Sequence, residues 1–264
     1  GLGPSGFNSG SARVYQFSNG IGGTWAQIGQ DIDGISGLND NGLSVDINGV
    51  GNRIIIGEPF NDIGSPERGS TRIYELSAGG TWTQLGQSLN GQTGDFYNGW
   101  SVAMNSSGDR IVISAPFTDL SATFTNVGII RSYQLSGSVW SQIGQNIIGD
   151  YEEHLGSTVD INDLGNRIVS FSVDKVQVYE LSGGTWAQLG QSITSNFFLQ
   201  SSRPRRNVSI NSIGDRIIIG LPSENPSGAT ATATIGTTKV YQYDSVCQEW
   251  NEINKIYGDT TFTF

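Results

Sequence analysis

The sequence predicts an all-β fold and, within that class, a β-propeller. Three observations carry this prediction: a composition that favours strands and turns, one phrase written five times, and four strand-length segments in each period. The 264 residues include 37 glycines, and only 14% of them are charged. A chain of this kind favours short strands joined by turns over helices.

The repeated phrase reads GTWAQIGQ at residues 23 to 30. Its later copies read GTWTQLGQ, SVWSQIGQ, GTWAQLGQ and, in a worn form, QEWNEINK. The tryptophans of the five copies are Trp25, Trp82, Trp140, Trp186 and Trp250. Their spacings of 57, 58, 46 and 64 residues indicate a period of about 56. Self-similarity over such a period is typical of propellers and solenoids.

Each period holds four segments, which we label A to D in chain order. Segment A alternates apolar and polar residues, as in GLSVDIN (42 to 48), and predicts a pleated strand. Segment B is a continuous apolar run such as NRIIIGEP, which predicts a strand buried on both faces. The turn between them, NGVGNR and its copies, combines asparagine with glycine and predicts a hairpin. Segment C reads TRIYEL or a variant, and segment D is the repeated phrase.

Four antiparallel strands with short hairpins describe one blade of a propeller. We therefore expect a single propeller domain, residues 1–264, of five blades with four antiparallel strands each. The blade repeats lie near 1–40, 41–98, 99–155, 156–206 and 207–264. Five D segments face only four A–B pairs, so we expect the chain termini to share one blade, which the segment 259–264 joins. A solenoid is the alternative architecture, and six or seven blades are the alternative count if the chain is part of a longer protein.

The stretch GLSVDINGVGNRIIIGEPFND…GSTRIYEL resembles the FG-GAP repeat of integrin-α-like β-propellers, and this resemblance covers nearly the whole chain. The counterparts of the family's Phe-Gly, Gly-Ala-Pro and Val-Tyr motifs are Asn41-Gly42, Gly57-Glu58-Pro59 and Ile73-Tyr74. The resemblance implies that segment A lines the axis and segment D lies outermost. Family members often carry an acidic calcium loop between A and B, but the turns here offer too few carboxylates. We therefore expect no metal and no cofactor.

Residues repeated at one strand position are expected to serve packing, which every blade shares. We expect each repeated tryptophan to be wedged between neighbouring blades. The alternative is a multivalent lectin with one sugar-stacking tryptophan per blade. The arginines that follow the A–B turn are expected to brace that turn or a neighbouring blade; they are Arg53, Arg110, Arg167 and Arg216.

Function is expected where the copies differ, on the long D–A and B–C loops that emerge on one face. Aromatic residues beside acids are common in recognition surfaces. The candidate binding residues on this face are Asp95, Phe96, Tyr97, Trp100, Tyr151, His154, Phe197 and Phe198. The alternative is that these aromatics plug the channel or pack loop on loop.

Charge and cysteine content exclude several classes of partner. The formal charge of −10 disfavours nucleic acid and anionic membranes, and no apolar run is long enough to cross a bilayer. We expect neither nucleic-acid binding nor membrane insertion. The lone Cys247 cannot form an intrachain disulfide, so packing must supply the stability. Asn105 and Asn207 begin sequons, which would be glycan acceptors in a eukaryotic secretory pathway.

The sequence predicts no catalytic residue, because one histidine and one cysteine cannot be assembled into a nucleophile with its base. The leading hypothesis is a non-catalytic recognition or adhesion propeller, extracellular or on a cell or virion surface. It would bind a protein or a glycan through its long-loop face. The alternative is a structural subunit of a surface filament, appendage or virion, packed against copies of itself or other subunits. A glycoside hydrolase would need a carboxylate pair, such as Asp95 with Glu152 or Glu153.

Overall fold

A computed structural model describes residues 10–18, 22–34, 42–61, 67–194, 207–222 and 236–258 of the chain. Within these ranges the secondary structure consists of β-strands without a helix, and so contains no helix that could span a membrane. The all-β class predicted from the sequence is confirmed. The number of blades and the closure of the ring stay predictions, because the described sheets do not form a closed ring.

The strands form a first unit and four larger antiparallel sheets, which we number II to V. The first unit pairs β2 with β3 and β1 with β4. Its strands are β1 (Ser11–Ala12), β2 (Tyr15–Phe17), β3 (Trp25–Gln27) and β4 (Ile32–Asp33). Sheet II has the order β5-β6-β7-β8, with β9 paired to β7. Its strands are β5 (Ser44–Ile47), β6 (Arg53–Glu58), β7 (Ser70–Leu76), β8 (Trp82–Gln84) and β9 (Leu89–Asn90).

Sheets III, IV and V repeat this order along the chain. Sheet III is built from β10 (Val102–Met104), β11 (Arg110–Ala115), β12 (Ile129–Ser136) and β13 (Val139–Ile148). Sheet IV is built from β14 (Thr158–Ile161), β15 (Arg167–Phe171), β16 (Lys175–Ser182) and β17 (Thr185–Gln188), with β18 (Ile193–Thr194) paired to β16. Sheet V is built from β19 (Asn207–Ile210), β20 (Arg216–Leu221), β21 (Thr237–Asp244) and β22 (Glu249–Tyr257).

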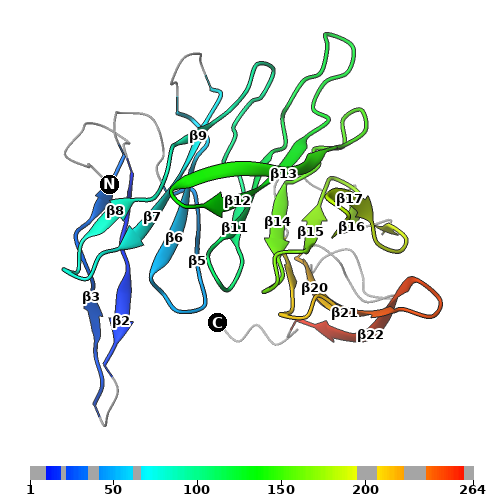
Figure 1. The fold of residues 1–264 in the computed structure, drawn as a ribbon. Coiled ribbons are helices and arrows are strands. Elements are labelled where there is room, and N and C mark those ends of the chain that lie inside the picture. Colours follow the sequence, from blue (N-terminus) through cyan, green and yellow to red (C-terminus); the bar gives the residue numbers. More distant parts are fainter. Residues whose placement is uncertain are drawn as a thin grey trace, which may run out of the picture.

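The sheets stand side by side in an arc that runs from the first unit to sheet V (Figure 1). The A–B hairpins of sheets II and III lie at one end of the strands, and the long loops lie at the other end. The innermost strands are neighbours, because β10 contacts both β5 and β14, and β14 contacts β19. This radial arrangement around the innermost strands is that of propeller blades.

The hydrophobic cores lie between consecutive sheets. Ile55 and Ile73 of sheet II pack against Val102 and Ile111 of sheet III, and all four are nearly or fully buried. Comparable clusters join the first unit to sheet II, sheet III to sheet IV, and sheet IV to sheet V. Each sheet therefore depends on its neighbour for the burial of its apolar face, as in other repeat proteins.

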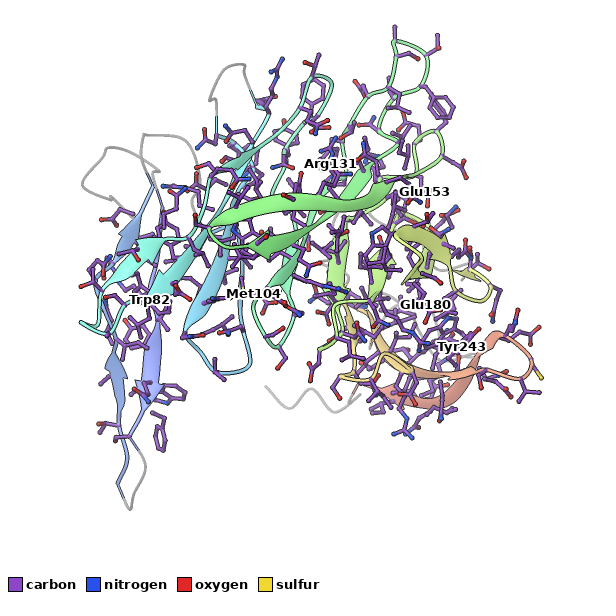
Figure 2. All side chains as sticks on the ribbon, viewed as in Figure 1. Trp82, Met104, Arg131, Glu153, Glu180 and Tyr243 are labelled. Carbon is purple, nitrogen blue, oxygen red and sulfur yellow. The ribbon has the colours of Figure 1, made fainter. Side chains whose placement is uncertain are left out.

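Side chains also link the innermost strands to one another. Asp46 of β5 accepts a hydrogen bond of 2.7 Å from the backbone N–H of Met104 in β10, a residue labelled in Figure 2. Asp160 of β14 accepts a hydrogen bond from the N–H of Ile210 in β19 in the same way. Between β10 and β14, the Ser101 hydroxyl accepts from the N–H of Val159. These bonds satisfy backbone donors at strand edges that would otherwise lack a partner.

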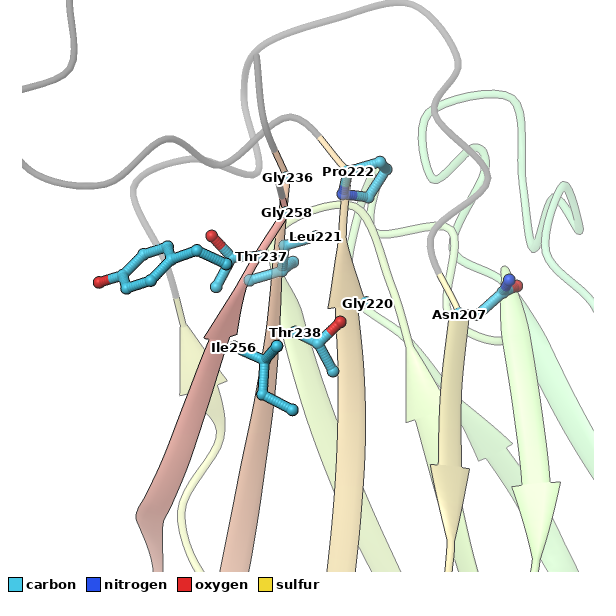
Figure 3. A pocket seen from close by; sticks show the side chains of 10 residues that line it. Asn207, Gly220, Leu221, Pro222, Gly236, Thr237, Thr238, Ile256 and Gly258 are labelled. Carbon is cyan, nitrogen blue, oxygen red and sulfur yellow. The ribbon is translucent and has the colours of Figure 1, made fainter. Parts of the chain in front are cut away.

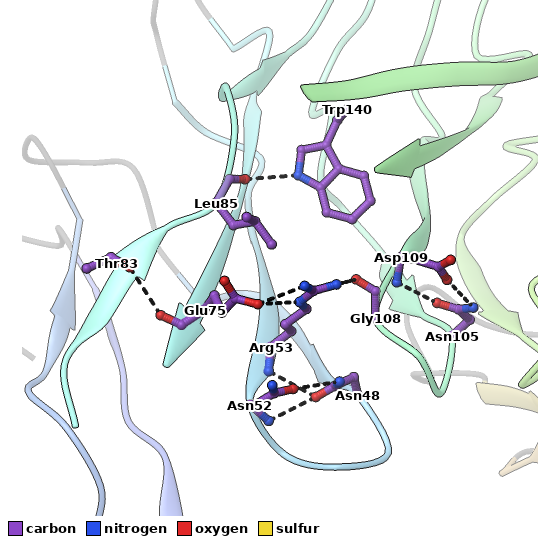
Figure 4. Close-up of polar contacts among 10 residues, drawn as sticks. All are labelled: Asn48, Asn52, Arg53, Glu75, Thr83, Leu85, Asn105, Gly108, Asp109 and Trp140. Carbon is purple, nitrogen blue, oxygen red and sulfur yellow. Dashed lines mark hydrogen bonds and ion pairs between the residues drawn. The ribbon is translucent and has the colours of Figure 1, made fainter. Parts of the chain in front are cut away.

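The A–B turns are held by one repeated asparagine and linked to the next sheet by one repeated arginine (Figure 4). The Asn48 side-chain oxygen accepts from the backbone N–H groups of Asn52 and Arg53. Arg53 donates to Glu75 at 2.8 Å and to the Gly108 carbonyl, in the next sheet's turn, at 3.2 Å. Arg110 and Arg167 donate to the corresponding carbonyls of Gly165 and Gly214. Arg216 belongs to sheet V, has no further turn beyond it among the described residues, and is exposed.

The repeated phrase joins each outer strand to the one before it. The Trp82 indole N–H donates to the Ile28 carbonyl of the first unit at 2.9 Å. Its ring lies against Gly29, where a Cβ would come within 2.5 Å of the indole. Gln30 completes the contact, because its amide accepts from the Trp82 N–H at 3.0 Å and donates to the Trp82 carbonyl at 2.8 Å. We call this combination of indole, glycine and glutamine the indole lock.

The indole lock recurs at all four boundaries between consecutive units. Its remaining members are Trp140 with Gly86 and Gln87, Trp186 with Gly144 and Gln145, and Trp250 with Gly190 and Gln191. The four locked tryptophans are 2 to 4% exposed. All four glycines have positive φ, between 69° and 78°, which a residue with a side chain adopts at a cost. The phrase is therefore repeated because it carries both parts of the indole lock: a tryptophan that packs against the preceding unit, and a Gly-Gln pair that receives the tryptophan of the next one.

Trp25 corrects the expectation that all five tryptophans are wedged between blades. Its side chain is 68% exposed, and its ring contacts Phe17 of its own unit at a centroid distance of 5.3 Å. The reason is positional, since no described sheet precedes the first unit. Asn105, which begins a sequon, is 2% exposed and its amide donates to Ser107 and Asp109 inside the A–B turn, so the folded protein does not present it for glycosylation.

Trp140→Ala should lower the free energy of unfolding by about 3–5 kcal/mol, because it opens a cavity between sheets II and III and removes a hydrogen bond. Trp25→Ala is the matched control and should cost less than about 1 kcal/mol, because its ring is mostly in solvent. Urea unfolding followed by far-ultraviolet circular dichroism measures both. Equal losses in the two variants would contradict the indole lock as the joint between sheets.

Candidate functional site

The site residues predicted from the sequence lie on the loops at the end of the sheets opposite the A–B hairpins. Two D–A loops carry most of them, residues 91–101 before sheet III and residues 149–157 before sheet IV. The B–C loops of sheets II and III lie beside them and add Phe60 and Phe117. Phe197 and Phe198 lie outside the described residues, as does most of the basic stretch 202–207.

Six rings gather on these loops and form what we call the aromatic cluster. Its members are Phe60, Phe96, Tyr97, Trp100, Phe117 and His154, all partly buried. Tyr97 is central, with ring centroids 5.0 Å from Phe60 and 5.4 Å from Phe117. Trp100 lies 5.0 Å from Phe117, and Phe117 lies 5.1 Å from His154. Most of these contacts are edge-to-face or tilted, the arrangement that aromatic pairs favour.

Four residues of the site have left-handed backbone. Glu67, Tyr97, Glu152 and His154 have φ values of 59°, 62°, 55° and 52°. Positive φ is unfavourable for residues with side chains, and it persists only where the surroundings hold it. The holding contacts are equivalent in the two loops: Tyr97 N–H donates to the Glu67 carbonyl, and His154 N–H donates to the Asn126 carbonyl. The backbone thus directs Tyr97 and His154 into the cluster.

His154 is the titratable ring of the cluster. Burial lowers the pKa of His154 below its ordinary value of 6.5, and the charge of Glu152 and the nearby Pro116 backbone offset this only in part. Its Nε2 atom lies 3.7 Å from a carboxylate oxygen of Glu152, and its Nδ1 atom is buried. Glu152 is held in turn by Thr125 and Asn126. The result is an imidazole that is neutral at pH 7 beside an oriented carboxylate.

Tyr97 brings a second polar group to the cluster. Its hydroxyl donates to Glu67 at 3.1 Å. Desolvation and this carboxylate raise the pKa of Tyr97 above its ordinary value of 10. The phenol therefore stays protonated at neutral pH and acts as a hydrogen-bond donor. Glu67 and Glu152 place carboxylate groups at two edges of the aromatic cluster.

Asp95 does not present its carboxylate to a ligand. Its side chain is 1% exposed and forms a two-point ion pair with Arg131 of β12, at 2.7 and 3.0 Å. It also accepts the N–H of Gln92 within its own loop. Asp95 therefore anchors the loop that carries Phe96 and Tyr97. The expectation that Asp95 binds a ligand is therefore corrected: its role is structural.

Two further acids beneath the loops are paired in the same manner. Glu153 contacts Lys175 at 3.2 Å, and Figure 2 shows it toward the same end of the sheets as Arg131. Glu58 pairs with Arg72 and accepts from Asn61. These buried pairs do not leave the free carboxylate pair that a glycoside hydrolase built on Asp95 and Glu153 would need.

Tyr151 lies outside the aromatic cluster. Its ring is 6.3 Å from that of Phe124, and the residue is 58% exposed. The structure therefore joins four of the predicted binding residues, namely Phe96, Tyr97, Trp100 and His154.

Two carboxylates on the innermost strands, Asp46 and Asp160, have raised pKa values. Desolvation raises the pKa of Asp46 above its ordinary value, and the charge of Asp160 adds to the rise. Desolvation likewise raises the pKa of Asp160, and hydrogen bonds from Ser209, Ile210 and Ile161 partly oppose it. Each carboxylate accepts backbone N–H groups, including one from the next sheet, so we assign both to the joining of the inner strands.

A hollow of about 390 Å³ lies at the end of sheet V, away from the aromatic cluster (Figure 3). It is lined mainly by Asn207, Gly220, Leu221, Thr237, Thr238 and Ile256. This lining offers no acid and base together, so we place no chemistry there. In the described part of the chain, no group of three or more His, Cys, Asp or Glu residues could hold a metal ion.

Comparison with known proteins identifies the fold. No family model matches the chain, and neither does any curated protein. A solved protein of unknown function from Desulfotomaculum acetoxidans superposes with a TM-score of 0.57 at 11% identity, over 95% of this chain and 64% of that one. A candidate 6-phosphogluconolactonase from Bacteroides fragilis superposes with a TM-score of 0.57 at 13% identity, over 94% and 65%.

A periplasmic gluconolactonase from Pseudomonas aeruginosa superposes with a TM-score of 0.50 at 9% identity, over 93% of this chain and 82% of that one. At these identities the likeness shows the fold alone, which is that of a β-propeller. The chain spans about two thirds of the length of the first two structures.

These neighbours correct the functional prediction. The sequence predicted a non-catalytic adhesion propeller, or a structural subunit, and no enzyme. Two of the superposed propellers are named for lactone hydrolysis, so the prediction of a non-catalytic protein is corrected: this fold occurs in proteins named as enzymes. Its physical premise was that one histidine and one cysteine cannot be assembled into a nucleophile with its base, whereas hydrolysis of an activated ester needs only a base and a water molecule.

Sequence reasoning underrated Phe60, Phe117 and Glu152. The two phenylalanines follow the repeated proline of segment B, in GEPF and SAPF, and this shared position is a readable signal. Glu152 stands two residues before the only histidine. No sequence pattern indicated that the two D–A loops would bring Tyr97 and His154 to the same cluster.

Asp95→Ala should lower the free energy of unfolding by about 3–5 kcal/mol, because it leaves the Arg131 charge buried without its partner. Glu180→Ala is the control and should cost about 1 kcal/mol or less, since the Glu180–Arg167 pair is partly exposed. Chemical denaturation measures both. Similar losses would show that the Asp95 pair is not the anchor of its loop.

Asp160→Asn should remove a pH dependence of stability. The folded form of Asp160 has a pKa above the ordinary 3.8, so the folded state binds more protons in that window. The contribution of the carboxyl group is therefore greatest at low pH and is lost as pH rises from 3.8 through the raised folded pKa. The amide keeps an acceptor for Ile210 and does not titrate. Unfolding free energies from pH 3.5 to 8 should fall less steeply for the variant, and parallel curves would contradict the shift.

Proposed function

We propose that this chain forms part of a hydrolase of the lactonase type. The aromatic cluster binds the ring of a neutral sugar lactone, and His154 acts as the general base. The observation that carries the proposal is the position of the His154 imidazole, which lies 3.7 Å from the Glu152 carboxylate and against the ring of Phe117 in the aromatic cluster, with a pKa lowered by burial. The fold shared with proteins named as lactonases supports the choice of reaction.

The aromatic cluster suits a sugar ring. Trp100, Tyr97 and Phe117 present partly exposed ring surfaces, which contact the C–H groups of a sugar. Glu67 and Glu152 at the edges accept hydrogen bonds from sugar hydroxyl groups. Both carboxylates and the chain's net charge of −10 repel a phosphorylated substrate. A neutral lactone therefore fits better than a phosphorylated one.

The reaction follows from the position of His154. The imidazole removes one proton from a water molecule as the water oxygen bonds to the lactone carbonyl carbon. The bond between this carbon and the ring oxygen then breaks, and the imidazolium returns the proton to the departing oxygen. The product is the open-chain sugar acid. Glu152 stabilises the imidazolium that forms in between.

We retain several finer predictions from the sequence as proposals: the FG-GAP resemblance, the extracellular or surface location, and binding of a protein, a glycan or copies of the chain. The closure of the ring is also a proposal. In its five-blade form the termini share one blade and sheet V is the neighbour of the first unit, whereas a larger ring places a further blade between them. The support for these proposals is the repeat itself and its composition. The greater length of the solved propellers allows more than five blades in the complete ring.

His154→Asn should lower kcat/KM for glucono-δ-lactone by about 10²- to 10⁴-fold, because it removes the general base. Asparagine tolerates the positive φ at this position, so the loop should keep its conformation. In the unsubstituted protein, kcat/KM should be level above pH 7 and fall at lower pH as His154 is protonated, with a midpoint below 6.5. A pH-stat assay corrected for spontaneous hydrolysis measures both.

Tyr151→Ala is the control, since Tyr151 shares the loop with His154 but lies outside the aromatic cluster. It should leave kcat/KM unchanged. A protein that hydrolyses the lactone no faster than buffer would overturn the lactonase proposal. Full activity in His154→Asn would overturn the role of this residue.

A further inference from the structure

The first unit carries one half of an indole lock that the described part of the chain leaves open. Its outward face presents Tyr15, Phe17 and Trp25, which are 50%, 44% and 68% exposed. Their counterparts in sheet II are Tyr74, Leu76 and Trp82, and these pack against the first unit. The same set of side chains is therefore an interface in sheet II and a free surface in the first unit.

The internal locks define what this surface binds. In all four, the indole lies on a glycine with positive φ, and a glutamine bonds both backbone groups of the tryptophan. The partner of a locked tryptophan is thus a sheet whose outer segment carries a Gly-Gln pair, after the outer strand or, in sheet III, within it. The four Gly-Gln pairs of this chain, at 29–30, 86–87, 144–145 and 190–191, are each occupied by the tryptophan of the next sheet.

The fifth copy of the phrase lacks the receiving half. Asn254 stands where the other copies have glycine, and Lys255 stands where they have glutamine. Asn254 lies in strand β22, where it pairs with Val240 beside a register shift, and it does not have the positive φ of the four glycines. A side chain at this position enters the space that the indole occupies in the other locks. A lysine side chain cannot accept a hydrogen bond from the tryptophan N–H.

The outer face of sheet V is nevertheless apolar. Ile218 and Ile253 are 44% and 51% exposed, whereas their counterparts in sheet II, Ile55 and Leu85, belong to the core between sheets II and III. Two complementary apolar faces on one chain would favour head-to-tail assembly into filaments. The changes at 254 and 255 remove the lock from one of these faces and so oppose that assembly.

We propose that the face built on Tyr15, Phe17 and Trp25 is a docking surface for one further blade of the same repeat type, the next blade of the ring. That blade carries a Gly-Gln pair after its outer strand and is not sheet V of a second copy. The argument rests on continuity with the four internal interfaces, and it does not depend on the lactonase activity.

In the test, a second protein molecule supplies the Gly-Gln pair that would receive Trp25. The probe is a full-length variant, Trp25→Ala/Asn254→Gly/Lys255→Gln, which restores the Gly-Gln pair and removes its own free tryptophan. Sedimentation velocity of this variant mixed with the unsubstituted protein should show a 1:1 complex. Replacing the unsubstituted protein by Trp25→Ala should weaken the complex by at least about 100-fold, as expected when a central tryptophan is lost from an interface.

Two further mixtures complete the test. The unsubstituted protein with Trp25→Ala, which has a native tail, should not associate. In a variant whose only change among residues 254 and 255 is Lys255→Gln, the glutamine of the indole lock is restored but Asn254 still fills the space for the indole. This variant should bind more weakly than the probe. This milder variant also serves if the triple variant does not fold, as judged by circular dichroism.

Lack of association between the unsubstituted protein and a folded probe would overturn the proposal. So would self-association of the unsubstituted protein that disappears in Trp25→Ala, since the native tail would then be the partner. A complex that forms equally well with and without Trp25 would also overturn it. Each outcome is independent of lactone hydrolysis, which is measured at a different site.

Discussion

The structure depends on the contact between one tryptophan and the Gly-Gln pair of the preceding sheet. The contact combines apolar burial with three hydrogen bonds, and all three require the sheets to be at one distance and in one register. Only glycine leaves room for the indole and takes the positive φ at little cost. Because the same indole lock is used at every boundary, each sheet has the same distance and orientation relative to the one before it. Repetition of this geometry produces the radial arc.

Much of the fold was readable in the sequence for this reason. The strand order, the A–B hairpins and the burial of four tryptophans follow from residues repeated at fixed positions, and packing is what every copy shares. The role of Gln30 and its equivalents in the other copies was less readable. Each bonds to backbone groups of a tryptophan in another sheet, and a sequence pattern does not identify a backbone partner. The exposure of Trp25 was unpredictable from its own copy of the phrase, since it depends on what precedes the first unit.

The candidate site was predictable only in part. Its residues lie on the loops where the copies differ, so repetition gives no guide to their contacts. Aromatic residues beside acids indicated four residues that the structure brings together in the aromatic cluster. Asp95 was misassigned because an acidic residue on a loop reads the same whether it faces solvent or a buried arginine. The paired position of Tyr97 and His154 depends on positive φ values that neither residue type favours.

The site and the indole lock are physically connected. Phe60 extends from sheet II and Phe117 from sheet III, while His154 lies on the loop between sheets III and IV, so the aromatic cluster bridges three blades. The spacing of its rings is therefore set by the joints at Trp140 and Trp186, which lie on the outer strands. Within each loop, buried pairs such as Asp95–Arg131 fix the loop to the next sheet. A site assembled across blades needs indole locks that are the same at every boundary. It also needs loops that vary in sequence but are anchored to the sheets by buried ion pairs.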